Sequence, residues 1–181
     1  MSRNRYILLD RDGVINQESD DFIKSPEEWQ PIDGSLEAIA LLNEHGYKVA
    51  VITNQSGVAR GLFKEATLKK IHAKMRQMTA EKGGKIDAIY FCPHGPNDGC
   101  TCRKPKPGLL KSFAAEKNVD LTGITFIGDS IRDIQSAQAV GAIPILVKTG
   151  KGQKTLTDNP DLNIPVFENL YAAAKHITSG Q

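Results

Sequence analysis

The sequence contains no long apolar run, and this absence argues against a helix that spans a membrane. Such a helix needs about 20 consecutive apolar residues, whereas the first apolar run of the chain covers only residues 6–9. That run is also too short for the hydrophobic segment of a secretion signal, which takes about 7–15 residues. We therefore expect a soluble, cytoplasmic protein with no membrane partner.

Charge of one sign and aromatic side chains are also scarce. The chain has 23 Lys and Arg against 21 Asp and Glu, so its net charge is only +2, and 6% of its residues are aromatic. Nucleic-acid-binding domains usually present a strongly basic face. Those that bind single strands place aromatic side chains among the basic ones, so that bases can stack on them. We therefore expect no nucleic-acid partner.

Low-complexity tracts, internal repeats and long linkers are missing as well. Domains commonly contain about 100 to 200 residues, so residues 1–181 are expected to form one domain. Nothing in the sequence indicates an extended dimerisation helix, and we expect a monomer.

The sequence does contain an alternation of short apolar runs with amphipathic stretches. The runs cover residues 6–9, 48–52, 86–91, 124–127 and 142–147, and stretches with helical spacing begin near residues 35, 65, 108, 132 and 170. Strands that alternate with helices pair in parallel through crossovers. We therefore predict an α/β fold, a three-layer sandwich with a mainly parallel, Rossmann-like sheet. The run 142–147 should be an edge strand, because Pro144 lacks an N–H group.

Polar residues stand where four of the predicted strands end. They are Asp10, Thr53, Cys92 and Asp129. Open parallel sheets bind ligands in the crevice beyond the carboxyl ends of their strands. These four residues are therefore expected at one rim of the sheet.

Carboxylates should cluster at this rim. Asp10 and Asp12 follow the first strand, and Asp129 follows a later one. Clustered carboxylates stay ionised at neutral pH only where a cation compensates them, and oxygen ligands suit Mg²⁺. One carboxylate can act as a nucleophile toward phosphorus, and a second can act as general acid and base. Phosphoryl oxygens must also be neutralised, for which Lys104 and Lys106 are candidates.

Each of these features also has an ordinary structural interpretation. Asp10 and Asp12 could form a turn, and Thr53 could simply end a strand. Asp129 could cap a helix, and Lys104 could be a solvated charge. The order of the features favours a site, because the acid pair, the hydroxyl, the lysine loop and the later acid follow successive strands.

All three cysteines lie within eleven residues, close to one histidine. Cys92, His94, Cys100 and Cys102 are ligands of the kind that bind structural Zn²⁺ in a closed tetrahedral set. The alternative is three free thiols and a chance histidine. A zinc ion would hold the chain just before Arg103 and thereby steady the basic loop. The remaining histidines lack such neighbours and are expected at the surface or at helix ends: His45, His72 and His176.

Taken together, the motifs resemble those of the haloacid-dehalogenase (HAD) phosphohydrolase superfamily, in its zinc-bearing histidinol-phosphatase-type subgroup. The matching segments are residues 10–14, 53–61, 92–94, 102–105 and 128–133. The expected helices and strands fill the intervals between the motifs and leave no room for a cap domain. A capless HAD fold with an open site and a zinc-binding loop at residues 92–102 is therefore expected.

The resemblance implies a role for each motif residue. Asp10 would be the nucleophile and Asp12 the general acid and base. The Asp10 carboxylate, the Asp12 backbone carbonyl and the Asp129 carboxylate would hold Mg²⁺. Asp133 would orient Lys104 or a metal-bound water. The residues expected to contact the substrate, with Thr53 and Lys104 also catalytic, are Thr53, Asn54, Gln55, Ser56, Arg103, Lys104 and Ser130.

The activity that the resemblance implies is hydrolysis of a phosphorylated sugar. The best match within the subgroup is to phosphatases that remove the 7-phosphate of a heptose bisphosphate, in the synthesis of nucleotide-activated heptose for lipopolysaccharide. Glu18, Ser19, Asp20 and Asp21 follow the first motif and suit sugar hydroxyls, although they could equally form a solvated acidic turn.

Three other functions stay open. A histidinol-phosphate phosphatase would share the nucleophile, the zinc loop and the basic pair. An open site could also admit the phosphorylated end of a larger sugar or of a nucleic acid. A zinc-stabilised binding module without catalysis is disfavoured, because Asp10, Asp12 and Lys104 are all present.

Overall fold

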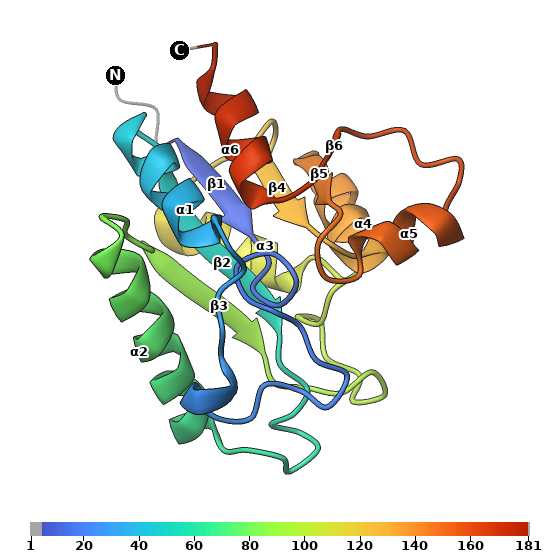
Figure 1. Cartoon of the computed structure of the whole chain (residues 1–181). Coiled ribbons are helices and arrows are strands. Elements are labelled where there is room, and N and C mark those ends of the chain that lie inside the picture. Colours follow the sequence, from blue (N-terminus) through green and yellow to red (C-terminus); the bar gives the residue numbers. More distant parts are fainter. Residues whose placement is uncertain (1–4, 181) are drawn as a thin grey trace.

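The computed structural model describes residues 5–180, and the strands of this part of the chain form one parallel sheet (Figure 1). The order across the sheet is β3-β2-β1-β4-β5-β6. The strand order reverses at β1, which pairs with both β2 and β4. Such a reversal opens a crevice at the carboxyl ends of the strands. The strands are β1 (Tyr6–Leu9), β2 (Lys48–Asn54), β3 (Ala88–Cys92), β4 (Thr125–Gly128), β5 (Ile143–Val147) and β6 (Val166–Phe167).

Helices connect the strands and cover both faces of the sheet. In Figure 1, α1 and α6 lie side by side over one face, and α3 lies behind the other. The α2 helix joins the first face, and α4 joins the second. The helices are η1 (Pro26–Glu28), α1 (Ser35–Glu44), α2 (Glu65–Glu81), α3 (Gly108–Lys117), α4 (Ile131–Ala139), α5 (Gly152–Asp158) and α6 (Leu170–Thr178).

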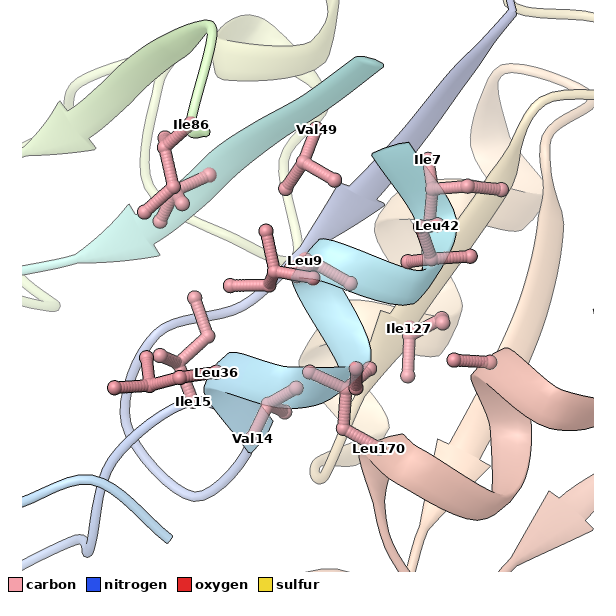
Figure 2. Packing of buried hydrophobic residues seen from close by; sticks show 14 of the residues in the cluster. Ile7, Leu9, Val14, Ile15, Leu36, Leu42, Val49, Ile86, Ile127 and Leu170 are labelled. Atoms are coloured by element: carbon pink, nitrogen blue, oxygen red, sulfur yellow. The ribbon is translucent and has the colours of Figure 1, made fainter. Parts of the chain in front are cut away.

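The alternation of side chains along β1 explains this two-sided core. Ile7 and Leu9 belong to the cluster under α1, α2 and α6, whereas Leu8 belongs to the cluster under α3 and α4, because successive side chains of a strand point to opposite faces. Figure 2 shows the first cluster, to which α1 contributes Leu42 and α6 contributes Leu170. Both faces of the sheet are therefore buried, and the predicted three-layer α/β sandwich is confirmed.

One prediction about the sheet is wrong, because β5 is not an edge strand. Leu146 and Val147 pair with the two-residue strand β6 on the far side of β5. Ile143 donates its N–H to Ile124 on the β4 side, so the donor that Pro144 lacks would face the β6 side. Pairing on that side starts only at Leu146, and the proline interrupts no ladder. A strand as short as β6 leaves little pattern in the sequence.

The fold places the polar ends of the strands together. In Figure 1, the loops that follow the arrowheads of β1, β2 and β3 lie at the same end of the sheet. Within residues 5–180, no helix is both long enough and apolar enough to cross a membrane. Residues 1–4, where we expect no secretion signal, lie outside the described residues.

Candidate active site and metal centre

Asp10 directly follows β1, so the central region of the sheet fixes its position. Its N–H donates to the carbonyl of Ile127 in β4 at 3.0 Å. Its Oδ1 accepts the N–H of Arg11 at 2.7 Å and lies 3.1 Å from Nζ of Lys104. The residue is 8% exposed and lines a cavity of about 260 Å³. The carboxylate is therefore held firmly at the floor of an open site.

Lys104 is buried and bound from several sides. Its Nζ donates to Oδ1 of Asp133 at 2.7 Å and to the carbonyl of Ile52 at 2.9 Å. The side chain of Asn54 clamps the lysine backbone, accepting its N–H at 3.0 Å and donating to its carbonyl at 3.2 Å. Burial alone would lower the pKa of Lys104, but the carboxylates of Asp10 and Asp133 raise that pKa above its ordinary value. The lysine is therefore a fixed cation.

Asp133 uses both of its carboxylate oxygens within the protein. While Oδ1 receives Lys104, Oδ2 accepts the N–H groups of Asp129 and Ser130, each at 3.2 Å, and the Ser130 hydroxyl at 3.1 Å. These last contacts cap the start of α4. A Cβ on Gly128 would lie 2.3 Å from Oδ2, so glycine is required where β4 passes this carboxylate. Asp133 thus holds the Lys104 ammonium group through Oδ1 and the start of α4 through Oδ2.

The site carries more negative charge than its lysine compensates. Oxygens of Asp10, Asp129 and Asp133 all lie within 4.8 Å of one another. Burial, followed by the charge of Asp133, raises the pKa of Asp10 well above its usual value. The same two causes raise the pKa of Asp129 to about 7. A divalent cation would relieve this repulsion, and a set of carboxylate oxygens fits the hard ion Mg²⁺.

Two glycines allow the loops after β1 and β5 to meet at Asp129. Its Oδ2 accepts the N–H of Lys151 at 2.9 Å. A Cβ on Gly13 would lie 2.0 Å from this oxygen, and one on Gly150 would lie 2.4 Å from it. Both residues also have positive φ angles, of 83° and 57°, which only glycine adopts at low cost.

Asp12 is held by hydrogen bonds on both oxygens. Oδ1 receives Nε and Nη2 of Arg11 at 3.0 and 2.8 Å and Nδ2 of Asn16 at 2.9 Å. Oδ2 receives Nε2 of Gln55 at 3.0 Å. Burial alone would raise the pKa of Asp12, but the Arg11 guanidinium and these hydrogen bonds hold it below its usual value. In the free protein the group is therefore an ionised carboxylate that can take up a proton.

The cavity gathers most of the residues that the sequence predicts to form the site. Thr53 does not line it, because its side chain is fully buried and its hydroxyl receives Nε2 of Gln55 at 3.0 Å. Asp20 and Asp21 are exposed outside the lining. The predicted residues that do line the cavity are Asp10, Asp12, Glu18, Ser19, Asn54, Gln55, Ser56, Arg103, Lys104, Asp129, Ser130 and Asp133.

Five further residues line the cavity, although the sequence analysis did not predict them as part of the site. They are Phe22, Ile23, Arg60, Arg132 and Lys151. Arg60 lies inside the second motif, and its guanidinium stacks over the Phe22 ring at 5.4 Å. Arg132 directly precedes Asp133, so position at the rim was a usable signal for these two arginines. Lys151 follows β5 and had no such signal; its Nζ lies 3.8 Å from Glu18.

The cysteine loop brings its four candidate ligands together. Their ligand atoms lie within 4.8 Å of one another, and no disulfide joins the three thiols. Nδ1 of His94 is 3.4 Å from Sγ of Cys92 and 3.3 Å from Sγ of Cys102, while Sγ of Cys92 is 3.7 Å from Sγ of Cys100. Three thiols and one imidazole are a donor set typical of structural Zn²⁺, and the cluster fits the ion in this respect. Sγ of Cys92 and Sγ of Cys102 are 2.9 Å apart, closer than the roughly 3.7 Å between two zinc-bound sulfurs. Arg103 donates to the carbonyl of His94 at 3.2 Å, which ties the loop to the cavity.

The expectation for His72 is wrong. This histidine lies in the middle of α2, is 7% exposed, and places Nε2 3.2 Å from Nη1 of Arg11. The helical pattern alone did not reveal its burial, because a polar residue on the inner face of α2 requires a polar partner that comes from a different part of the chain.

Comparison with known proteins gives a consistent result. A family model described as HAD-hydrolase-like matches residues 101–173. The D-glycero-beta-D-manno-heptose-1,7-bisphosphate 7-phosphatase of Pseudomonas putida is 51% identical over 173 residues, which cover 96% of this chain and 99% of that protein. The protein of the same name from Pseudomonas aeruginosa is 53% identical over 174 residues, which cover 96% of this chain and 97% of that protein. A crystal structure of D,D-heptose 1,7-bisphosphate phosphatase from B. bronchiseptica, complexed with magnesium and phosphate, matches with a TM-score of 0.95 at 50% sequence identity. The match covers 98% of this chain and 99% of that one.

The fold and the carboxylate cluster define the class of protein, which is that of the HAD-like hydrolases. With about half of its residues identical over nearly its whole length, the chain belongs to the family of the D-glycero-beta-D-manno-heptose-1,7-bisphosphate 7-phosphatases. The superfamily and the phosphatase class expected from the motifs are thereby confirmed.

Proposed function

We propose that this chain is a Mg²⁺-dependent phosphatase that removes the 7-phosphate of D-glycero-D-manno-heptose 1,7-bisphosphate. The observation that carries the proposal is the placement of the Asp10 carboxylate 3.1 Å from the Lys104 ammonium group, beside Asp12, in one cavity. The names of relatives that match nearly the whole chain support the substrate. The enzyme would act in the cytoplasm as a monomer, with residues 1–181 forming its one domain.

The residues divide the chemistry between them. An oxygen of Asp10 attacks phosphorus, the bond from phosphorus to the sugar oxygen breaks, and Asp12 gives that oxygen its proton. Asp12 takes up this proton before the reaction, because the negative charge of the bound ester favours its protonated form. Asp12 then removes a proton from water, the water oxygen attacks phosphorus, and the bond to Asp10 breaks. Lys104 stays paired with the phosphoryl oxygens throughout.

The carboxylate cluster is suited to the proposed metal. The Asp10 and Asp129 carboxylates and the backbone carbonyl of Asp12 would hold Mg²⁺, since both oxygens of Asp133 are already engaged. When bound, the ion would supply positive charge against the phosphoryl oxygens. The solved relative from B. bronchiseptica, whose name states magnesium and phosphate, supports this assignment. Zn²⁺ would be held by the four clustered ligands Cys92, His94, Cys100 and Cys102.

The charges around the cavity favour a bisphosphate over histidinol phosphate. Arg60, Arg103 and Arg132 all line the cavity. Burial lowers the pKa of Arg103 most, and the positive charges of Arg132 and Arg60, which repel its guanidinium group, lower it further. Within residues 5–180 none of the three forms an ion pair with a carboxylate. A second phosphate would relieve this repulsion, whereas the ammonium group of histidinol phosphate would add to it.

The test is a phosphate-release assay with Mg²⁺ on the heptose bisphosphate and on histidinol phosphate. We expect a kcat/KM at least about 100-fold higher for the heptose bisphosphate. The variant Asp10→Asn should release no phosphate from either compound. A preference for histidinol phosphate would overturn the substrate assignment, and equal turnover by Asp10→Asn would overturn the nucleophile assignment.

A further inference from the structure

A buried polar path connects the middle of α2 to the carboxylate of Asp12. The Arg11 side chain, which is 0% exposed, occupies the centre of this path. Two of its nitrogens, Nε and Nη2, hold Oδ1 of Asp12 at 3.0 and 2.8 Å. The third, Nη1, lies 3.2 Å from Nε2 of His72. Each end of the guanidinium fork therefore has its own partner.

The contact between Arg11 and His72 fixes the state of the imidazole. A guanidinium group has only donors, so Nε2 of His72 must accept the hydrogen bond, and the ring proton must sit on Nδ1. The imidazole is therefore neutral. Burial and the Arg11 charge lower the pKa of His72 to about 3, which agrees with this assignment. A buried cation needs acceptors for its N–H groups, and His72 supplies an acceptor for Nη1, the nitrogen for which no contact with Asp12 is seen.

We propose that His72 is a positioning residue, which holds Arg11 so that Asp12 presents Oδ2 to the reacting phosphate ester. The inference rests on the proposed phosphatase function and extends it to a residue of α2. With Oδ1 bound by Arg11, Oδ2 is the oxygen that can exchange a proton, and Gln55 steadies it at 3.0 Å. Asp12 lines the cavity with 31% of its side chain exposed, so this oxygen has access to a substrate.

Removal of the imidazole acceptor would leave Nη1 of Arg11 buried without its partner. The guanidinium would then turn toward the nearest remaining acceptor, the Asp12 carboxylate, and compete for Oδ2. Proton transfer to the leaving group would become slower, whereas binding of the phosphate by Lys104 would not change. The expected effect is a loss in kcat with little change in KM.

The choice of leaving group separates this effect from a general loss of structure. A sugar oxygen leaves only with a proton, whereas p-nitrophenolate is stable without one, so kcat/KM for p-nitrophenyl phosphate does not depend on the general acid. We would measure kcat/KM on the heptose bisphosphate and on p-nitrophenyl phosphate for wild type, His72→Leu and His72→Gln. Met75→Ala, a buried truncation three residues further along α2, is the control for lost stability.

The expected result is a loss of about 10- to 100-fold on the sugar substrate for His72→Leu, at least about tenfold greater than its loss on p-nitrophenyl phosphate. His72→Gln, whose amide oxygen can accept from Arg11, should largely restore the sugar activity, and Met75→Ala should affect both substrates alike. Should His72→Leu fail to fold, Arg11→Lys, which keeps the charge but lacks the fork, must show the same selective loss. Equal losses on the two substrates would overturn the inference, whereas a wild-type enzyme inactive on the heptose bisphosphate would instead overturn the proposed function.

Discussion

Nζ of Lys104 lies 3.1 Å from Oδ1 of Asp10, although the two residues come from loops that are far apart in the sequence. We expect Lys104→Met to lower kcat/KM by about 10²- to 10³-fold, the usual cost of removing one preorganised group that stabilises charge in a transition state. The measurement is steady-state phosphate release with saturating Mg²⁺. Lys106→Met is the matched control, because Lys106 is exposed and its ammonium group donates to the carbonyl of Cys100 at 2.7 Å. An equal loss in the control would refute the assignment of the phosphate lysine.

Asp129 gives the second prediction, which concerns the metal. Mg²⁺ at about 100 times its dissociation constant should stabilise the wild type by about 2.7 kcal/mol, or roughly 5–10 °C in Tm for a chain of this size. Asp129→Asn should remove this shift together with the activity. The variant should also melt higher than wild type without metal, since it lacks one of the three repelling carboxylates. Thermal unfolding with and without Mg²⁺ measures the effects on stability, and phosphate release measures the activity. Asp161→Asn, at an exposed acid, should behave as wild type in both. A full Mg²⁺ shift in Asp129→Asn would contradict the ligand assignment.

The sheet and its rim could be predicted from the sequence because both depend on local patterns. Apolar runs that end in Asp10, Thr53, Cys92 and Asp129 indicate strands whose carboxyl ends share one edge. The strand β6 and the burial of His72 could not be predicted in this way. A two-residue strand has no periodicity, and the partner of His72 is Arg11, which only the tertiary fold brings within 3.2 Å.

The basic residues around the cavity also show that contacts made only in the tertiary fold cannot be predicted from the sequence. Arg103 was found because it adjoins a motif that the sequence displays. Arg60 lies inside a motif and Arg132 adjoins one, which was a usable signal for their place at the rim, but this signal does not distinguish a solvated arginine from one that lines the cavity. The structure separates them by placing these side chains around one cavity.

His72 gives the third prediction, on the pH dependence of stability. Its pKa is lowered to about 3 in the folded state, against about 6.5 when unfolded, so the unfolded chain binds the extra proton between these values. The neutral imidazole of His72 contributes fully to the free energy of unfolding above pH 6.5. This contribution is lost as the pH falls, and the loss amounts to about 2 kcal/mol at pH 5. Burial lowers the pKa of His72 most, the charges of Arg11 and Arg76 lower it further, and the Asp12 carboxylate opposes them.

The measurement is urea unfolding of wild type and His72→Gln at pH 8, 6.5 and 5. The difference in unfolding free energy between the two proteins should be constant above pH 7 and should change by about 2 kcal/mol in favour of the variant at pH 5. Titration of the carboxylates changes the unfolding free energy of both proteins alike, so it cancels in the difference. A difference independent of pH would show that His72 titrates normally.

The cluster of Cys92, His94, Cys100 and Cys102 gives the fourth prediction. Arg103 follows this cluster directly and is tied to it through the carbonyl of His94, so a zinc ion would hold the basic loop in place. Removal of zinc with a selective chelator, with Mg²⁺ kept in excess, should lower Tm and kcat/KM together. Addition of Zn²⁺ should restore both. Zinc-stripped protein with unchanged Tm and turnover would show that the loop needs no metal.

Arg132 gives the last prediction, which concerns the second phosphate of the substrate. It lines the cavity together with Arg60 and Arg103, its charge lowers the pKa of Arg103, and among residues 5–180 it forms no ion pair with a carboxylate. If these arginines bind the phosphate that is not cleaved, Arg132→Gln should raise KM for the heptose bisphosphate about tenfold, equivalent to roughly 1.4 kcal/mol of binding. KM for the heptose 7-phosphate, which lacks that group, should change less than about threefold by the same scale. Lys111→Gln, which removes an exposed cation from α3, is the control for net charge. An increase in KM that is equal for both sugars would mean that Arg132 acts on the cleaved phosphate or on the sugar. Arg60, Arg103 and Arg132 would then no longer explain a preference for the bisphosphate.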